Sequence, residues 1–395
     1  MLLQLSQIIY YMKRIPSIIS AGFLLFSFGN SLKAQTTNKI NVVTTAVPFL
    51  RISPDARSGG MGELGLATST DASSSFYNLA KTPFSQYNTG IGLTYTPWLQ
   101  DLGLKDVYLL AASGYHKLSE NEGLSASIRY FSLGNIQFTD YSGSELGVGR
   151  PRELAADLGY SRKLGEKLAL GLAIRYIHSD LAAGYASNGN TYKPGNAVAA
   201  DVSIFYNGVD AAGQGWRFGA AFSNLGTKIG YTNDATAKEY IPANFGIGAS
   251  YTKAFDEQSK LSFGIDINKL LVPTAPVSQD NGGPVDSANL SEYHNQSVVS
   301  SWFKSFGNSA YALSGGLEYG YNDQFFFRAG YFYEGKNQGD RQYFTLGVGL
   351  KYNVIGLNFS YIIPSGSGVT RNPLSNTLRF GLVFDLDGPE ATTQQ

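Results

Sequence analysis

The segment 60–65, Gly-Met-Gly-Glu-Leu-Gly, matches the spacing G-x-G-x-x-G that binds the pyrophosphate of dinucleotides. That chemistry needs a strand before the glycines and a helix after them, so that the phosphates meet a helix N-terminus. Here the preceding residues, 53–58, have the composition of a turn around Pro54, and no strand–helix–strand pattern follows. We therefore expect no nucleotide cofactor at these glycines.

The other residues that could take part in catalysis or metal binding are few and scattered along the chain. Three histidines, His116, His178 and His294, lie far apart without the spacing of metal ligands, which favours surface or strand positions. The chain has no cysteine, which excludes disulfides and thiolate metal sites. The serine-rich segments 73–75 and 365–368 lack the strand–turn–helix setting of an activated serine. We therefore predict no metal, no cofactor and no enzymatic activity.

The composition narrows the class of protein. Lys plus Arg equals Asp plus Glu, 30 each, so no basic field would attract nucleic acid. Charged residues make up 15% of the chain, well below the roughly 25% of soluble proteins, whereas glycine is abundant with 46 residues. No stretch after residue 34 approaches the roughly 20 apolar residues of a membrane-spanning helix. A membrane location would therefore require β-strands.

The N-terminus has the pattern of an export signal. Lys13 and Arg14 form a positive region, residues 18–28 form an apolar region, and Leu-Lys-Ala at 32–34 forms a cleavage motif before Gln35. A buried helix is the alternative, but a proline and two glycines within the segment disfavour it. We expect residues 1–34 to be removed and the mature protein to leave the cytoplasm.

From about residue 90, strand-length segments alternate between apolar residues and small or polar ones. In 168–176, Leu, Ile and Tyr occupy every second position, with Ala, Gly and Arg between them. Successive side chains of a strand point to opposite faces, so one face of the sheet is apolar. The pattern predicts fourteen strands, near 90–97, 107–117, 123–133, 153–163, 168–179, 197–206, 216–223, 243–252, 260–269, 311–321, 325–333, 343–352, 355–361 and 376–386.

The connections between these strands alternate in length. A short turn follows each even-numbered strand and a longer polar loop follows each odd-numbered one, the largest spanning about 270–310. Outer-membrane barrels have short periplasmic turns and long external loops. The sequence therefore predicts an all-β protein, a fourteen-stranded antiparallel transmembrane β-barrel over 90–386, in the outer membrane. Both termini would be periplasmic, with the long loops at the cell surface.

The two faces of the predicted barrel differ in character. An Arg or Lys on the lipid face near the midplane costs about 2–4 kcal/mol, so charges should point inward. The outward set includes Leu124, Ile128, Phe263, Ile265, Phe344 and Val348. The inward set includes Arg129, Asp157, Arg175, Asp201, Asp266, Glu318 and Arg328, whose mixed signs suggest pairing across the interior. Outer-membrane lipid is therefore an expected partner of the outer face.

The last predicted strand carries a further motif. Arg379, Gly381, Phe384 and Leu386 fit the pattern polar-x-Gly-x-x-apolar-x-apolar. This pattern resembles the assembly signal that the outer-membrane insertion machinery reads on the final strand of a barrel. The nine residues 387–395 follow it as a polar tail, which we expect in the periplasm.

The segment before the first strand behaves differently, because it does not alternate. We predict that residues 35–89 fold into the periplasmic mouth of the barrel as a hatch, or plug. Residues 71–73 have the character of a cap for a short helix through 76–80. A flexible leader is the alternative, but Val47, Phe49 and Met61 would then remain exposed.

This segment carries a family resemblance. The run 46–57, AVPFLRISPDAR, together with the glycines at 60–62 and the segment 76–80, FYNLA, resembles the hatch of FadL-type barrels. It resembles more closely the PorV family of the Bacteroidetes type IX secretion system. Where FadL-type barrels usually have Asn-Pro-Ala, this chain has Asn-Leu-Ala at 78–80. The resemblance assigns six candidate hatch residues: Arg57, Gly60, Gly62, Asp71, Asn78 and Ala80.

The resemblance implies a function in protein secretion. Proteins similar to this family associate with the giant type IX translocon barrel and bind the C-terminal domain of emerging cargo. They then carry the cargo to a sortase-like attachment complex at the cell surface. The wider resemblance leaves an alternative, a FadL-like channel for uptake of hydrophobic molecules. An uptake channel should contain an apolar ligand pocket, whereas a shuttle should recognise its partners on external loops.

One stretch of the longest loop could serve such recognition. Within 296–306, the apolar residues recur at helical spacing. An external amphipathic helix with aromatic residues could pack on cargo or translocon, because aromatic side chains dominate interface hot spots. Alternatively, the helix folds over its own barrel as a lid. The candidate partner-binding residues are Val298, Val299, Trp302, Phe303 and Phe306.

Overall fold

The computed structural model of the protein describes residues 43–100, 103–139, 142–182, 184–187, 190–234, 237–276, 287–336, 338–364 and 377–387. The predicted export signal, 1–34, lies outside the described residues. Of the predicted polar tail, 387–395, the structure describes only Asp387.

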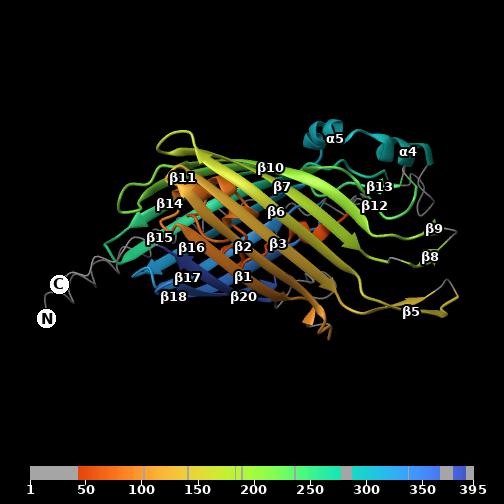
Figure 1. The fold of residues 1–395 in the computed structure, drawn as a ribbon, viewed down its shortest axis with the longest axis horizontal. Coiled ribbons are helices and arrows are strands. Elements are labelled where there is room, and N and C mark those ends of the chain that lie inside the picture. The colour runs from red at the N-terminus through yellow and green to blue at the C-terminus, as the bar shows by residue number, and fades with distance from the viewer. Residues whose placement is uncertain are drawn as a thin grey trace, which may run out of the picture. The chain divides into compact units, whose positions relative to one another are not determined.

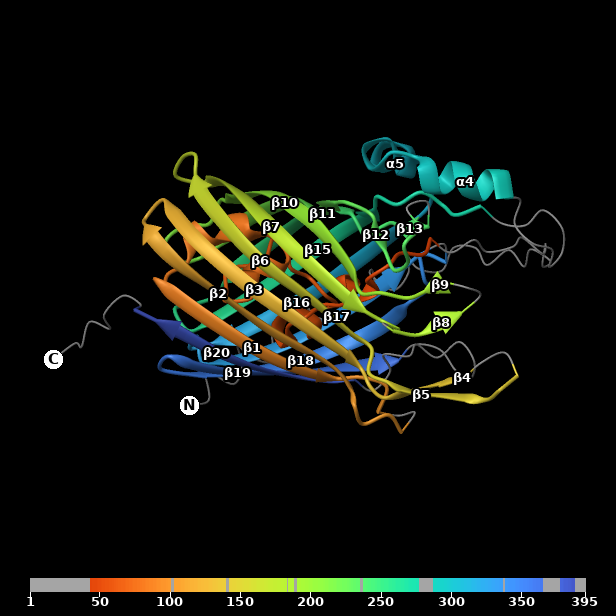
Figure 2. The same cartoon turned by 45° about the vertical axis from the view of Figure 1, so that its right-hand side comes forward.

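Fourteen antiparallel strands form a closed barrel, in which each strand pairs with the next barrel strand along the chain (Figure 1 and Figure 2). The first and last strands pair with each other and complete the circle. The predicted barrel is therefore confirmed, with every strand within a few residues of its expected bounds. The strands are β1 (Thr89–Pro97), β2 (Val107–Ser119), β3 (Glu122–Leu133), β6 (Arg152–Lys163), β7 (Leu168–Asp180), β10 (Gly195–Asn207), β11 (Gly215–Gly226), β14 (Asn244–Ala254), β15 (Ser259–Leu270), β16 (Tyr311–Tyr321), β17 (Phe325–Glu334), β18 (Gln342–Tyr352), β19 (Ile355–Pro364) and β20 (Leu378–Leu386).

The connections separate into a short-turn end and a long-loop end of the barrel. The turn between β18 and β19 is 353–354, and Asn353 adopts the positive φ (52°) that such tight turns favour. Three loops at the other end carry two-stranded hairpins that the sequence did not predict, because strands this short show no alternation. They are β4 (Ile136–Thr139) with β5 (Glu145–Gly149), β8 (Ala186–Ser187) with β9 (Asn190–Thr191), and β12 (Ile229–Gly230) with β13 (Lys238–Glu239).

The loop between β15 and β16 contains two helices, α4 (Ser287–Asn295) and α5 (Val298–Lys304), and a 3-10 turn, η6 (Ser305–Gly307). The helix predicted within 296–306 is confirmed as α5. Its first turn is capped by Ser297, whose side chain accepts a hydrogen bond from the backbone N–H of Ser300. Helix α4 was not predicted, since its residues are mostly polar.

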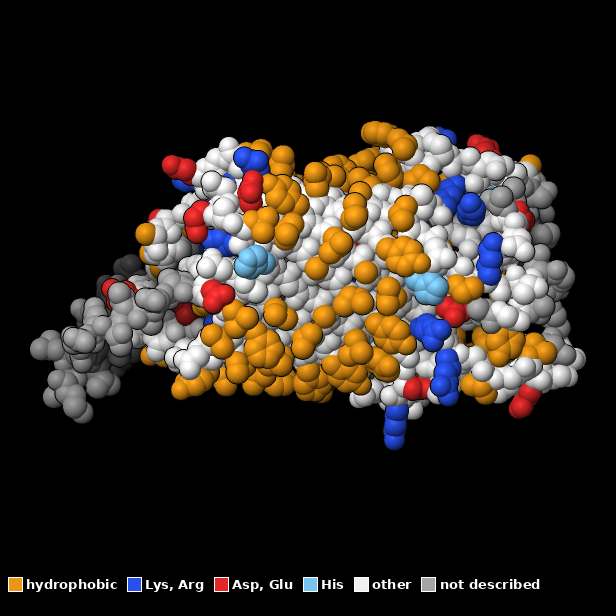
Figure 3. Space-filling model, in the orientation of Figure 1, with side chains coloured by type: hydrophobic (Ala, Val, Ile, Leu, Met, Phe, Trp, Pro, Cys, Tyr) orange, Lys and Arg blue, Asp and Glu red, His pale blue; other side chains and the backbone are white. Residues whose placement is uncertain are grey.

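The outer face of the barrel is apolar along its strands. Predicted outward residues such as Ile265 on β15 and Phe344 on β18 are exposed over about half of their surface. Figure 3 shows hydrophobic side chains over the strands and charged ones gathered toward the two ends. This belt is the surface that lipid requires, and a closed barrel leaves no unpaired strand edge within it. Among the described residues, no helix is long and apolar enough to cross a membrane.

The inner face carries most of the predicted charges as ion pairs. Arg175 on β7 bridges Asp157 on β6 and Asp201 on β10, with 2.9 Å between its Nη2 and the carboxylate of Asp201. Arg328 on β17 donates from Nε to Glu318 on β16 over 2.6 Å. All five side chains are buried, so these charges pair across neighbouring strands as the alternation predicts.

Candidate functional site

The N-terminal segment, residues 43–88, lies inside the barrel and is called the hatch below. Its backbone follows the inner wall: from Ala56 to Ser85 the contacts pass from β20 down to β2, and Ala72 lies against β1. The hatch is therefore a belt that touches the inner circumference of the wall. The contacts pair Ala56 with Gly381 of β20, Gly60 with Gly347 of β18, Leu64 with Gly264 of β15, Leu66 with Gly219 of β11, Asn78 with Ile204 of β10, Leu79 with Gly171 of β7, Thr82 with Gly123 of β3 and Ser85 with Tyr115 of β2.

The glycines at 60–62 follow a short helix, α3 (Ala56–Gly59), and meet the wall backbone to backbone. A Cβ on Gly60 would lie 3.0 Å from the Cα of Gly347, and one on Gly62 would lie 2.7 Å from backbone atoms of Gly315 and Tyr331. Gly62 also has φ +67°, which side-chain-bearing residues rarely adopt. The G-x-G spacing thus serves a close approach of two backbones. The inward glycines of β16, β17 and β18 were a readable signal for it.

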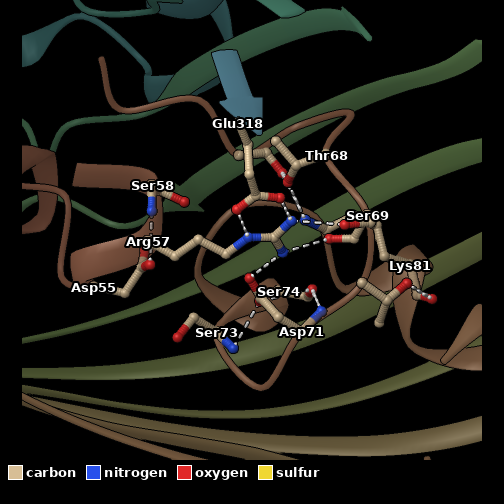
Figure 4. Close-up of polar contacts among 12 residues, drawn as sticks. Asp55, Arg57, Ser58, Thr68, Ser69, Asp71, Ser73, Ser74, Lys81 and Glu318 are labelled. Carbon is tan, nitrogen blue, oxygen red and sulfur yellow. Dashed lines mark hydrogen bonds and ion pairs between the residues drawn. The ribbon is translucent and has the colours of Figure 1, made fainter. Parts of the chain in front are cut away.

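Arg57 is the polar centre of the hatch (Figure 4). Its guanidinium donates from Nε and Nη2 to the two oxygens of Glu318 over 3.0 and 2.8 Å, a bidentate pair with the wall. It also donates to Asp71 Oδ2 over 2.7 Å and to the backbone and side-chain oxygens of Ser69. Although burial opposes the charge, the carboxylates of Glu318 and Asp71 raise the pKa of Arg57. Two predicted hatch residues, Arg57 and Asp71, are therefore directly bonded.

Asp71 also begins a turn, but the single helix predicted through 76–80 is wrong. The structure has two 3-10 turns, η3 (Ser74–Phe76) and η4 (Leu79–Phe84), separated by Tyr77 and Asn78. The break has a physical reason, because Asn78 leaves the helical conformation to bond in three directions. Its Nδ2 donates to the carbonyls of Leu66 and Ile204, each over 3.0 Å, and its Oδ1 accepts from the N–H of Ala80 over 3.1 Å.

Two buried charged residues complete the fixation of the hatch: Asp266, which was predicted to point inward, and Lys81, which was not singled out from the sequence. Asp266 on β15 accepts from the N–H groups of Gly65 and Leu66 over 2.8 and 3.0 Å. Lys81 donates to the carbonyl of Gly65 over 2.8 Å and to Thr68 Oγ1 over 3.1 Å. Because Lys81 is held by neutral oxygens in a buried position, desolvation lowers its pKa to about 8. A lone lysine in a short polar segment gives no sequence signal of burial.

The predicted assembly signal divides between the two faces of β20. Phe384 and Leu386 belong to the outward register, whereas Arg379 and Gly381 point into the lumen and are buried. Arg379 Nη2 donates to Glu63 Oε1 over 3.3 Å, and the hydroxyl of Tyr343 donates to the same oxygen over 2.7 Å. The inward half of this motif therefore contacts the hatch.

Helix α5 lies at the long-loop end, above the outer wall rather than over the lumen. The ring of Phe306 lies 6.4 Å from that of Phe245, which stacks at 4.5 Å on the outward-facing Phe222 of β11. Phe303 is 74% exposed, whereas Ser301 is buried, so Val299 and Phe303 lie on the exposed side of the helix, while Phe306 reaches the outer wall. Of the five predicted residues, Val299, Phe303 and Phe306 are exposed and Val298 and Trp302 are half-buried. The lid interpretation is therefore not what the structure shows.

Two cavities flank the hatch inside the barrel. One of about 400 Å³ opens toward the short-turn end, with Arg57, Arg217 and Lys351 in its lining. One of about 140 Å³ lies toward the long-loop end, with Arg51, Arg129 and Glu334 in its lining. Both linings mix charged, polar and apolar side chains. Neither has the predominantly apolar wall that a hydrophobic ligand prefers.

Within the part of the chain that the structure describes, no cluster of His, Asp and Glu has the geometry of a metal site. His116 bonds to Thr89 Oγ1 over 2.8 Å and His178 to Asn196 over 2.9 Å, both on the exposed surface. His294 lies in the last turn of helix α4 and bonds to the carbonyl of Lys238. The three histidines therefore have separate local roles.

Comparison with solved structures finds barrels of low sequence identity. The toluene transporter TbuX of Ralstonia pickettii is 12% identical over 85% of this chain and 98% of its own, with a TM-score of 0.49. The toluene transporter TodX of Pseudomonas putida is 12% identical over 85% of this chain and 99% of its own, with a TM-score of 0.49. A FadL homologue of Pseudomonas aeruginosa is 11% identical over 84% of this chain and 98% of its own, with a TM-score of 0.46.

Comparison with protein families gives the identification. No curated protein matches the sequence. The family model described as "Type IX secretion system protein PorV" matches residues 34–277, more than half of the chain. This range contains the hatch and the first nine strands of the barrel, from β1 to β15. The chain belongs to the PorV family of type IX secretion system proteins.

Proposed function

We propose that this protein is a non-enzymatic shuttle of type IX secretion. It binds the C-terminal domain of a secreted cargo protein at the translocon barrel and delivers the cargo to the sortase-like attachment complex. Membership of the PorV family supports a place among the components of this system. The proposed orientation puts both termini in the periplasm and the long loops at the cell surface, where cargo and attachment complex would meet it.

The observation that carries the proposal is the hatch. It lies against the inner wall from β20 to β2, held by the Arg57–Glu318 pair and by backbone-to-backbone packing at Gly60 and Gly62. A lumen filled in this way offers little room for a passing molecule. Recognition of a protein partner then falls to the long-loop end.

The uptake alternative predicts a different interior. A channel for hydrophobic molecules needs an apolar pocket and a route past the hatch. The cavities on both sides of the hatch are instead lined partly by arginine, lysine and carboxylate side chains. These linings favour the shuttle.

Helix α5 is the proposed partner contact at the long-loop end. Val299, Phe303 and Phe306 form an exposed apolar stripe, and large apolar side chains on a surface are typical of interaction sites. Replacing Trp302 and Phe303 together by Ala should reduce capture of cargo and association with the translocon. The matched control replaces Phe255 and Tyr352, exposed aromatics near the short-turn end, by Ala. Equal capture by both double variants would remove α5 from the proposal.

The whole proposal is tested by recovering the native protein from outer membranes with its bound material. We expect secreted proteins that still carry their C-terminal domains, together with the translocon barrel. Bound fatty acids in the absence of such proteins would overturn the shuttle and favour uptake. The α5 variant, recovered in the same way, separates a wrong contact surface from a wrong function.

A further inference from the structure

Among the described residues, the final strand β20 has the shortest pairings in the barrel, both at the closing seam with β1 and on its other side with β19. Among the described residues, β20 is in register with β1 over seven residues, from Thr89 to Tyr95, and with β19 over seven. Every other pair of adjacent barrel strands is in register over more residues. The final strand therefore has the fewest backbone pairs to hold it in place.

The hatch contacts both sides of this seam from within. On the β20 side, a Cβ on Gly381 would lie 3.3 Å from the Cβ of Ala56. On the β1 side, a Cβ on Gly92 would lie 3.3 Å from the Cβ of Ala72. Because residues 56–72 are one continuous stretch of chain, they join the first strand to the last independently of the seam's own hydrogen bonds.

A buried polar contact reinforces the β20 side. Arg379 is fully buried, and its Nη2 donates to Glu63 at 3.3 Å, while its Nε and Nη1 have no acceptor among the described residues. Glu63 has φ +68°, a conformation that residues other than glycine rarely adopt. The hatch therefore holds an unfavourable backbone conformation at the residue whose carboxylate meets Arg379. A buried guanidinium without a carboxylate is strongly disfavoured, so Arg379 depends on the hatch.

We infer that the hatch is an internal template on which the barrel closes. In this inference the hatch docks on the inner face of β20 before β20 pairs with β1, and its second contact with β1 then brings the seam together. Apart from Ala72, which contacts β1, the hatch contacts follow the wall from β20 at Ala56 to β2 at Ser85, which fits a segment that holds successive strands together. This role is separate from transport, since it concerns how the barrel is made.

The order of events can be measured because the chain has no cysteine. The pair Ala56→Cys and Gly381→Cys reports docking of the hatch on β20, since the two Cβ atoms would be close enough for a disulfide. Closure is reported by heat-modifiability, the resistance of the closed barrel to unfolding in detergent at room temperature. In pulse-chase labelling of cells, we expect the disulfide to form before the labelled chain becomes heat-modifiable. Heat-modifiable chains that acquire the disulfide only later would overturn the inference.

A second pair and a second measurement keep the test decisive if Gly381→Cys impairs assembly. Ala72→Cys with Gly92→Cys reports the β1 contact, and its disulfide should form together with closure rather than after it. In the purified protein, Glu63→Gln should lower the unfolding temperature of the barrel by several degrees. The control Asp266→Asn loosens the hatch on β15, far from the seam along the wall, and should lower it less. A larger effect of Asp266→Asn would contradict a special role at the seam.

Discussion

Replacement of Gly62 by Ala should dislodge the hatch, and the structure allows the cost to be worked out. The new Cβ would lie 2.7 Å from the carbonyl oxygen of Gly315 and from the backbone nitrogen and oxygen of Tyr331. These atoms belong to β16 and β17, so they cannot move aside as a flexible side chain would. Overpacking of this kind costs roughly 1–3 kcal/mol. The positive φ of +67° adds about 1–2 kcal/mol for a residue with a Cβ.

A third contribution comes from a hydrogen bond. The N–H of Gly62 donates to Thr345 Oγ1 over 2.8 Å, and displacement of the backbone would lose about 1 kcal/mol with it. The three contributions together give about 3–6 kcal/mol. The matched control is Gly213→Ala, because Gly213 has φ +79° but no atom within 4 Å of an added Cβ. Its conformational cost falls on the turn between β10 and β11, outside the hatch, so hatch opening should be unchanged in the control and the two variants should differ in hatch opening by about 3–6 kcal/mol.

Native-state proteolysis with trypsin measures this difference. Lys81 and Arg57 lie in the hatch and are protected in the folded protein, so cleavage there requires the hatch to leave the wall. When opening is fast relative to cleavage, the rate follows the population of the open form. A difference of about 3 kcal/mol or more should make hatch cleavage of Gly62→Ala on the order of a hundredfold or more faster than that of Gly213→Ala. Equal rates would show that backbone contact with the wall does not hold the hatch, and the reasoning would fail.

Three further predictions concern the polar contacts of the hatch. Lys81 has a pKa of about 8 in the folded protein against an ordinary 10.5, so the lysine binds its proton more tightly when the hatch is open. The free energy of hatch opening should therefore increase by roughly 3 kcal/mol between pH 8 and 10.5. This dependence on pH should be weaker in Lys81→Met, and an identical dependence would contradict the assignment. Arg57→Lys keeps the charge but loses the bidentate pair with Glu318, so hatch cleavage by a protease should accelerate about tenfold or more, whereas unchanged protection would mean the pair contributes nothing. Asn78→Ala leaves two buried carbonyls without their donor and should lower the unfolding free energy by about 2–4 kcal/mol in denaturant titration, an outcome that a value near zero would refute.

The strands of this barrel could be predicted because lipid imposes a simple code on them. A strand such as β7 must present apolar side chains outward at every second residue, whatever the rest of the chain does. The same code placed Asp157 and Arg175 inward, where they pair. The two-residue strands β8 and β9 escaped prediction, since two residues cannot show a period.

The path of the hatch could not be predicted, because its contacts are long-range and specific. Arg57 meets a carboxylate that is 261 positions away in the chain, and no local pattern announces that pairing. Asp71 and Asn78 were singled out by family resemblance, whereas Lys81 and Glu63 had no signal at all. The one overlooked clue was the series of inward glycines on neighbouring strands of the wall.

Those glycines also bear on what the protein does. Small inward residues in a barrel of this size suggest free space, and free space suggests passage of a substrate. Here β16, β17 and β18 carry glycines where the hatch backbone lies against them, so the hatch occupies part of the space that the missing side chains leave. If the lumen existed for transport, small side chains should line a continuous route and the hatch should be loosely held. The observed Arg57–Glu318 pair and the contacts on both sides of the seam argue instead for a hatch that stays. A barrel closed from within must bind its partners from outside, as the proposed shuttle would.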